Sequence, residues 1–138
     1  MKVLIINGVN LGRLGTREID IYGHATFEEY LQQLKQKFPD FYINYIQTDK
    51  LEEIVNQIHN SAQYDGIIIN PGAFTHTSII LADAVKSVTT PVIEVHISNL
   101  FGREQYRKSS CLSGCCQGFI SGFGLQGYEL ALRSFIKN

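Results

Sequence analysis

The sequence predicts an α/β fold built on a parallel, doubly wound β-sheet. Three observations predict this class: short apolar runs rich in Val and Ile, amphipathic stretches between them, and a regular alternation of the two along the chain. A chain of 138 residues suits one domain, and no repeat, low-complexity tract or linker divides it. Residues 1–138 are therefore expected to form a single domain.

Five apolar runs mark the expected strands. Residues 3–6, 66–69 and 92–95 form continuous runs of the kind that is covered on both faces of a sheet. Polar residues interrupt the run at 41–46, which is therefore expected nearer an edge. Residues 118–121 are expected to form a short fifth strand.

Helical periodicity fills the intervals between these runs. Thr26 begins one stretch and Glu29 follows three residues later, which is the pattern of a capping box, and Asp49 begins a second stretch in a similar way. The expected helices span 27–38, the segment after Asp49, about 76–88, and about 125 to the end. Strands that alternate with helices imply right-handed crossovers, so we expect a flavodoxin-like three-layer fold with helices on both faces of the sheet. By analogy, the strand order would be 2-1-3-4-5.

Composition excludes several classes of protein. Twelve basic and thirteen acidic residues give a formal charge of −1, which predicts no strong attraction to nucleic acid or to an anionic membrane. No apolar stretch approaches the roughly 20 residues that span a bilayer, and the N-terminal run is too short for a signal peptide, so a cytoplasmic location is expected. The three cysteines, in CLSGCC, lack paired metal-ligand spacing and are expected to be buried or incidental thiols.

Ligands of such a sheet bind at the carboxyl ends of the strands, near the switch point between strands 1 and 3. The segment after strand 1, residues 8–25, is long for a βα connection and carries Asn10, Arg17 and Tyr22 among several glycines. This pattern is typical of a closing lid or a binding loop, and a flexible surface loop is the open alternative.

Polar residues also follow strand 3. Asn70 ends the strand and His76 lies in the first turn of the helix that follows, where free backbone N–H groups favour an anion. Thr75 or Thr77 as a simple N-cap would explain the hydroxyls but neither Asn70 nor His76.

The segment after strand 4 contains a candidate acid or base. If Val95 faces one side of the sheet, Glu94 and His96 share the other. A histidine at the tip of a central strand suits acid–base chemistry, and a structural histidine is the equally open alternative. Arg103 and Arg107 lie four residues apart, on one face if this stretch is helical, and solvated charge is their simpler explanation.

Residues 122–127 fit the GxGxxG pattern of dinucleotide sites. That fingerprint requires a further strand and an acidic residue about 20 positions later, and the chain ends at Asn138. We therefore expect these glycines to serve a tight turn and close helix packing.

Taken together, four separated motifs resemble the type II 3-dehydroquinate dehydratases over nearly the whole chain. They are INGVNLGRLGTREIDIYG, IIINPGAFTHTS, PVIEVHISN and SGFGLQGYELAL. The resemblance implies one catalytic domain that eliminates water from 3-dehydroquinate through an enolate to give 3-dehydroshikimate, in the shikimate pathway or in quinate catabolism. It implies this small-molecule substrate as the partner, no metal or organic cofactor, and a homododecamer built from trimers.

The resemblance also implies roles for individual residues. Tyr22 would remove the proton next to the ketone, Arg17 would stabilise the tyrosinate, and His96 would protonate the leaving hydroxyl. Supporting roles fall on Asn10, which holds a water against the enolate oxygen, on Arg103 near the developing charge, and on Glu94 and Asn99, which orient His96. Substrate-binding roles fall on Asn70 with Ile97 and Ser98, on His76 and Arg107 for the ring hydroxyls, and on Asp83 from a neighbouring subunit.

These roles are physically consistent with one another. A tyrosine with an ordinary pKa near ~10 is ionised in about one molecule in a thousand at pH 7, which makes a tyrosinate base cost roughly 4 kcal/mol. Nearby arginines in a water-poor site offset a penalty of this size.

The sequence also departs from the family pattern. Val9 replaces a common Pro, Ala82 replaces a common Arg, and the segment 111–116 replaces a usual Tyr and Pro, while residues 47–53 match only loosely.

Two other classes of function remain open on the sequence. A flavodoxin-like binding module for a nucleotide, flavin or anion would explain the fold and the helix start after Asn70, but not Tyr22, Arg17 or His96. A catalytically inactive relative kept as an oligomeric scaffold would assemble without turnover.

Overall fold

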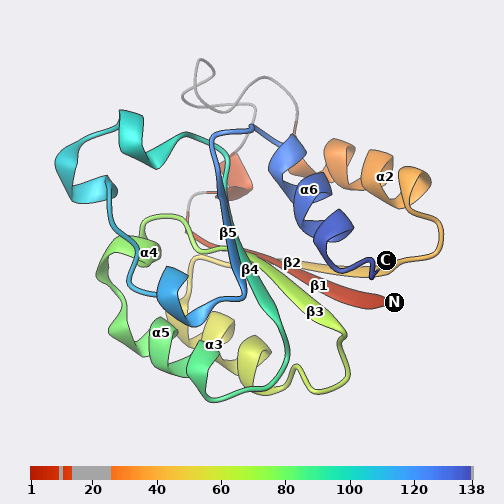
Figure 1. Cartoon of the computed structure of the whole chain (residues 1–138), viewed down its shortest axis with the longest axis horizontal. Coiled ribbons are helices and arrows are strands. Elements are labelled where there is room, and N and C mark those ends of the chain that lie inside the picture. The colour runs from red at the N-terminus through yellow and green to blue at the C-terminus, as the bar shows by residue number, and fades with distance from the viewer. Residues whose placement is uncertain (10, 14–25, 138) are drawn as a thin grey trace.

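A computed structural model of the chain shows a three-layer α/β fold, described for residues 1–9, 11–13 and 26–137 (Figure 1). Five parallel strands form one sheet in the order β2-β1-β3-β4-β5, as the sequence predicts. The strands are β1 (Lys2–Asn7), β2 (Tyr42–Gln47), β3 (Gly66–Asn70), β4 (Val92–His96) and β5 (Gly118–Ser121). The strand with interleaved polar residues, β2, lies at an edge as expected.

Helices connect the strands and cover both faces of the sheet. The α-helices are α2 (Phe27–Lys37), α3 (Leu51–His59), α4 (Phe74–Thr77), α5 (Ile79–Lys86) and α6 (Gln126–Ser134). Short 3₁₀ turns are η1 (Leu11–Arg13), η2 (Leu100–Gly102), η3 (Gln105–Arg107) and η4 (Ser113–Cys115). Within the described ranges, no helix is long and apolar enough to cross a membrane.

The helix starts confirm one expected cap and correct three others. The Thr26 hydroxyl accepts a hydrogen bond from the backbone N–H of Glu29 at 3.2 Å, as the capping pattern predicts. Asp49 is not a cap, because α3 starts from Lys50 without a side-chain cap. Thr75 and Thr77 cap no helix either, since both lie inside α4, which has no side-chain cap.

The helix expected at about 76–88 is two helices. Ser78 has extended backbone angles, φ −105° and ψ 100°, so it ends α4 and caps α5. Its hydroxyl accepts a hydrogen bond from the N–H of Leu81 at 3.0 Å. The break sets α4 apart as a separate short turn directly after β3 (Figure 1).

Alternate residues of the central strands pack into two cores. Val3 and Ile5 of β1 lie in the core under α2 and α6, whereas Leu4 and Ile6 lie in the core under α3 and α5. This two-sided burial explains why the central strands are continuous apolar runs rather than alternating ones. On the first face, an ion pair of 2.9 Å between Lys37 and Glu129 also joins α2 to α6.

Candidate active site

The carboxyl ends of β1, β3 and β4 lie side by side and bring their polar residues to one edge of the sheet. Asn7 pairs in register with Asn70, and the N–H of Gly8 donates to the Asn70 carbonyl oxygen at 2.7 Å. In the next strand pair, Ile69 is in register with Glu94. Asn10, Arg17 and Tyr22, which the sequence places beside this edge, lie outside the described residues.

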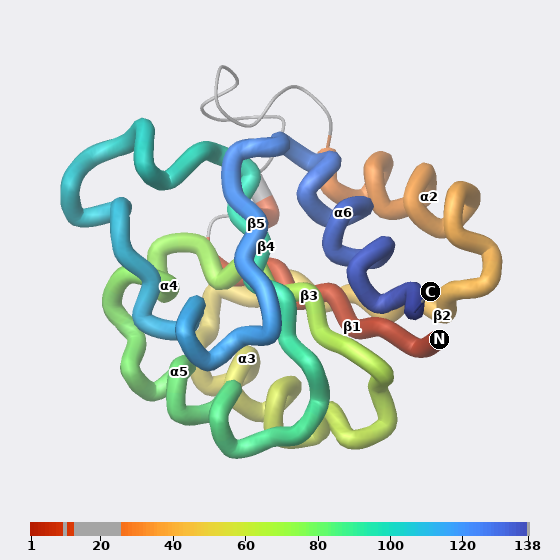
Figure 2. The backbone as a smooth tube through the Cα atoms, in the orientation of Figure 1, coloured from red at the N-terminus to blue at the C-terminus, as the bar shows by residue number. Residues whose placement is uncertain are grey.

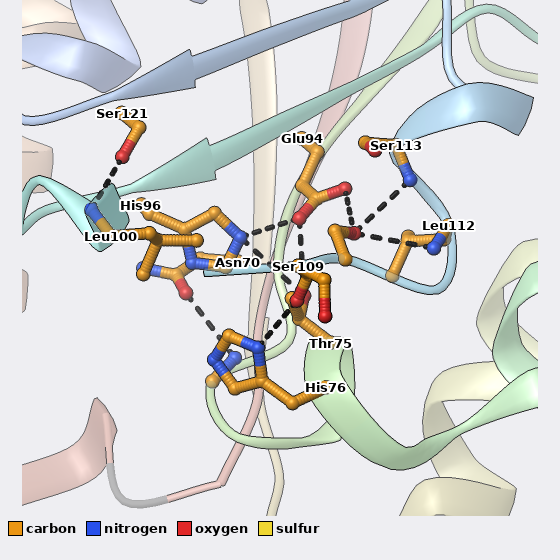
Figure 3. A network of polar contacts seen from close by, with 12 residues as sticks. Asn70, Thr75, His76, Glu94, His96, Leu100, Ser109, Leu112, Ser113 and Ser121 are labelled. Atoms are coloured by element: carbon orange, nitrogen blue, oxygen red, sulfur yellow. Dashed lines mark hydrogen bonds and ion pairs between the residues drawn. The ribbon is translucent and has the colours of Figure 1, made fainter. Parts of the chain in front are cut away.

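The strand-end pair Glu94 and His96 forms the centre of this edge. Both point to the face opposite Val95, as alternation along β4 predicts. His96 Nε2 lies 2.5 Å from Glu94 Oε2, and the two residues are 4% and 0% exposed (Figure 3). A contact with the carboxylate makes Nε2 the nitrogen that carries a proton. His96 Nδ1 has no hydrogen-bonding partner among the described residues.

Two hydroxyl groups that sequence analysis did not assign to the site also contact Glu94. Thr75 Oγ1 donates to Glu94 Oε2 at 3.1 Å, and Ser110 Oγ donates to Glu94 Oε1 at 2.9 Å. Thr75 is fully buried, so its hydroxyl serves this carboxylate rather than a helix cap. Ser110 comes from a segment that carries no recognisable motif, and no local signal in the sequence identifies it.

His76 joins the same network from α4. Its Nδ1 lies 2.7 Å from the carbonyl oxygen of Ser109, beside the segment that carries Ser110 (Figure 3). The imidazole is half-buried. The contact fixes the ring orientation and leaves Nε2 without a partner among the residues that the structure describes.

A second buried network holds Asn70. The Tyr128 hydroxyl accepts from Asn70 Nδ2 at 3.0 Å and donates to Asn7 Oδ1 at 2.7 Å, while Asn70 Oδ1 accepts from the N–H of Gly72 at 3.2 Å. Burial raises the pKa of Tyr128 well above its ordinary value, so the phenol is neutral and able to donate. Sequence analysis missed Asn7 and Tyr128, although Asn7 ends its strand just as Asn70 does.

The residues that follow β4 have separate positions. Ile97 is buried in the core, and Ser98 Oγ accepts from Arg103 at 3.3 Å. Asn99 is exposed and caps η2 by accepting from the N–H of Phe101 at 3.1 Å. Within the described parts of the chain, no hydrogen bond joins Asn99 to His96, so the expected orienting role has no support from this geometry.

The two arginines after β4 belong to separate short 3₁₀ turns, so the condition for a shared helix face is not met. Arg103 ends η2 and Arg107 lies in η3. They approach a shared carboxylate instead: Glu104 Oε2 lies 3.9 Å from Arg103 Nε and 3.0 Å from Arg107 Nε. A hydrogen bond from its own backbone lowers the pKa of the exposed Glu104 carboxyl group, and the two arginines lower it further.

The predicted residue Asp83 and a surface cavity lie outside this network. Asp83 is exposed on α5, and its side chain contacts no other candidate residue in the described structure. A shallow cavity of about 500 Å³ lies next to the network on the side of Ser110, lined by Leu100, Phe101, Lys108, Ser109, Ser110, Ser113, Gly114 and Phe119. Phe119, which lines the cavity, also contacts His96, with ring centroids 5.6 Å apart.

The glycine-rich turn before α6 has the structural role expected of it. Gly122 and Gly124 adopt left-handed backbone angles, φ 98° and 60°. A Cβ on Gly127 would lie 3.1 Å from a methyl group of Val95, so this glycine permits close packing of α6 on β4. Among the residues that the structure describes, no three His, Cys, Asp or Glu side chains gather as a metal site would require.

Fold and site together define a flavodoxin-like α/β protein with a buried imidazole–carboxylate pair beside the switch point of its sheet. Residues 1–136 match the family model of the class II dehydroquinases. The chain belongs to this family.

Similar proteins of known name agree with this assignment. A 3-dehydroquinate dehydratase of Caldicellulosiruptor saccharolyticus is 46% identical over 135 residues, which cover 95% of this chain and 93% of the relative. One of Clostridium perfringens strain SM101 is 45% identical and covers 100% of this chain and 97% of the relative. The crystal structure of a type II dehydroquinase from Butyrivibrio crossotus superposes with a TM-score of 0.94 at 38% identity, covering 98% and 97% of the two chains.

Proposed function

We propose that the chain is a 3-dehydroquinate dehydratase that eliminates water from 3-dehydroquinate to give 3-dehydroshikimate. The observation that carries this proposal is the match to the class II dehydroquinases over residues 1–136. A buried Glu94–His96 pair at the carboxyl edge of the sheet, where such folds bind ligands, supports it.

The elimination starts with removal of a proton. Tyr22, as tyrosinate, takes the proton from the carbon next to the substrate ketone, and Arg17 stabilises the tyrosinate. Asn10 holds a water against the enolate oxygen that forms, and Arg103 lies near the developing charge. Charge stabilisation of this kind is worth most in a site that excludes water.

The leaving hydroxyl requires an acid, and His96 supplies it. Since Nε2 contacts Glu94, Nδ1 is the nitrogen left to donate the proton. The enolate then collapses, the carbon–oxygen bond breaks, and the hydroxyl departs as water with the proton from His96. Glu94 orients the imidazole for this transfer through its contact with Nε2.

Substrate binding falls to the residues that border this pair. Asn70 and the backbone at Ile97 and Ser98 hold the substrate carboxylate, and this role is supported by the position of Asn70 at the end of the strand beside β4. His76 and Arg107 bind ring hydroxyls. That assignment is supported by Nε2 of His76, which has no partner among the residues that the structure describes.

The chain acts as a single catalytic domain in the cytoplasm and assembles from trimers into a dodecamer. Ile79 and Ile80, 70% and 63% exposed, lie one turn from the exposed Asp83 on α5. Such an apolar pair beside a carboxylate suits a subunit contact through which Asp83 reaches a neighbouring site. An Ile80→Lys variant should sediment as a smaller species than the wild type. An unchanged sedimentation coefficient would place the contact elsewhere.

The function is tested by ultraviolet absorbance of the purified protein mixed with 3-dehydroquinate, with and without a metal chelator. The expected result is a rising signal of the conjugated product that does not respond to the chelator and is strongly reduced in Tyr22→Phe and His96→Ala. His59→Ala is the matched control, because His59 lies in the last turn of α3, away from the strand ends. No product from a correctly assembled wild type would overturn the proposal.

A further inference from the structure

The segment from Ser109 to Ser113 is held against the two elements that carry the candidate histidines. The N–H of Cys111 donates to the Thr75 carbonyl oxygen at 2.7 Å, and the Ser109 carbonyl oxygen contacts His76 at the same distance. The hydroxyl of Ser110 reaches across to Glu94 of β4. Figure 2 shows the chain between β4 and β5 running outward and returning beside α4.

The hydroxyl proton of Ser110 has one direction available to it. Ser110 Oγ accepts hydrogen bonds from the N–H groups of Leu112 at 3.2 Å and Ser113 at 3.1 Å. A hydroxyl has two acceptor positions and one donor, so these contacts use both acceptor positions. The remaining proton points to Glu94 Oε1 at 2.9 Å. The backbone of the following turn therefore fixes Ser110 as a donor.

Thr75 holds the other oxygen of the same carboxylate. Its hydroxyl donates to Glu94 Oε2 at 3.1 Å, the oxygen that also contacts His96. Two neutral hydroxyls and one imidazole thus surround a carboxylate that is 0% exposed. Donors on both oxygens hold the plane of the carboxylate in one orientation.

We propose that Ser110 and Thr75 are positioning residues that hold the Glu94 carboxylate so that His96 keeps its proton on Nε2 and turns Nδ1 toward the substrate. This inference rests on the proposed function for its catalytic consequence, but the tautomer of His96 is a property of the free protein. A purely structural role for the two hydroxyls would affect stability without changing that tautomer.

The test is a nitrogen NMR measurement of the His96 imidazole in the free protein, with turnover measured alongside. Ser110→Ala and Thr75→Val each remove one hydroxyl, and Thr75→Val does so with little change in shape. In the wild type, neutral His96 should show the pattern of the Nε2–H tautomer. In each variant, the expected spectrum shows a mixture of tautomers, and kcat falls by about tenfold, the size expected for one hydrogen bond to a charged group.

Ser113→Ala is the matched control, since it removes a hydroxyl from the same segment and keeps the N–H that Ser110 accepts. It should leave both the tautomer and kcat as in the wild type. A further comparison uses Glu94→Gln: if Ser110 acts through this carboxylate, adding Ser110→Ala to Glu94→Gln should change kcat much less than it does in the wild type.

The outcomes separate this inference from the proposed function. A folded Ser110→Ala and a folded Thr75→Val that both retain the wild-type tautomer would overturn the positioning role, whatever their stability. If Ser110→Ala fails to fold, the tautomer in Thr75→Val decides in the same way. A wild type without turnover would overturn the proposed function and leave the tautomer result standing.

Discussion

Single polar residues, each buried with its partners, fix the geometry of the strand ends. Tyr128 of α6 is the clearest case, because its hydroxyl joins Asn7 of β1 to Asn70 of β3. The two asparagines are 63 positions apart in the sequence and lie in register in the sheet. Gly72 holds Oδ1 of Asn70, and the Tyr128 hydroxyl accepts one proton of Nδ2. Together these two contacts fix the amide plane and therefore the direction of the second Nδ2 proton.

Tyr128→Phe should therefore weaken both stability and substrate binding. Removing the hydroxyl leaves two buried atoms, Asn7 Oδ1 and Asn70 Nδ2, without the partner they have in the wild type, which costs about 1–3 kcal/mol of unfolding free energy. We also expect a raised KM, because Asn70 loses one of its two anchors. Urea denaturation and steady-state kinetics measure the two effects.

Tyr45→Phe is the matched comparison. The Tyr45 hydroxyl lies near the Asn7 side chain but makes no hydrogen bond of good geometry in the described structure, so its removal should cost much less stability than the loss of the Tyr128 hydroxyl. Equal losses of unfolding free energy in Tyr128→Phe and Tyr45→Phe would show that the hydrogen bonds of the Tyr128 hydroxyl do not stabilise the fold.

At the scale of elements, the close approach of β1 and β3 decides where the site residues meet. The chain leaves β1 through Gly8, whose N–H bonds to the Asn70 carbonyl oxygen. A Cβ on Gly8 would lie 2.5 Å from the carbonyl oxygen of Pro71, which is backbone and has little freedom to move. Glycine at this position therefore allows the two strand ends to lie side by side.

Gly8→Ala should separate these strand ends and reduce both stability and turnover. Overpacking against rigid backbone costs typically about 1–3 kcal/mol, and here the displacement reaches Asn70 directly. Thermal denaturation and kcat/KM are the measurements. Gly114→Ala, whose Cβ would meet nothing within 4 Å, should behave as the wild type. A fully active and stable Gly8→Ala would contradict the proposed dependence on close strand contact.

At the scale of the whole molecule, the core under α2 and α6 contains several phenols rather than aliphatic groups alone. Phe27 stacks on Tyr45 and meets Tyr128 edge to face, both with ring centroids 4.8 Å apart. Burial raises the pKa of Tyr45 to about 12, with the Asn7 side chain offsetting part of the effect, and raises the pKa of Tyr30 to about 12 with help from Glu129. Burial similarly raises the pKa of Cys116 to about 12 on the other face, reinforced by Glu94.

Stability should consequently fall steeply as the pH rises from about 9 to 12. The unfolded chain ionises these groups at their ordinary values, 9 for the thiol and 10 for the phenols, whereas the folded protein keeps their protons up to about 12. The unfolded state therefore binds fewer protons in this window, so the unfolding free energy falls as the pH rises. The contribution of these buried, protonated side chains to the unfolding free energy is fully present below pH 9 and is lost toward pH 12.

Circular dichroism and tyrosinate absorbance recorded during the same alkaline titration check this expectation. Part of the tyrosinate signal should appear together with the loss of circular dichroism and not before it. Complete tyrosine ionisation in a protein that retains its native spectrum would contradict the origin assigned to the effect.

The sequence alone predicted the fold well where local pattern and tertiary burial agree. The continuous apolar runs of β1, β3 and β4 follow directly from burial on both faces, and the cap at Thr26 follows from local hydrogen bonding. It failed at Ser78, where a continuous helical periodicity spans a break. The Ser78 hydroxyl accepts a hydrogen bond from the N–H of Leu81 and caps a new helix, and this local bond competes with continuation of α4.

The candidate site also has features that the sequence predicts and features that only the tertiary structure determines. By itself, the sequence determined which strand tips carry polar groups and that Glu94 and His96 share a face, because alternation along a strand is a local property. Tertiary structure alone decided that Ser110, Thr75, Asn7 and Tyr128 complete the two buried networks. The physical reason is that a hydrogen bond between residues up to 121 positions apart depends on how the chain folds back on the sheet. A local sequence pattern does not indicate which distant residues will meet.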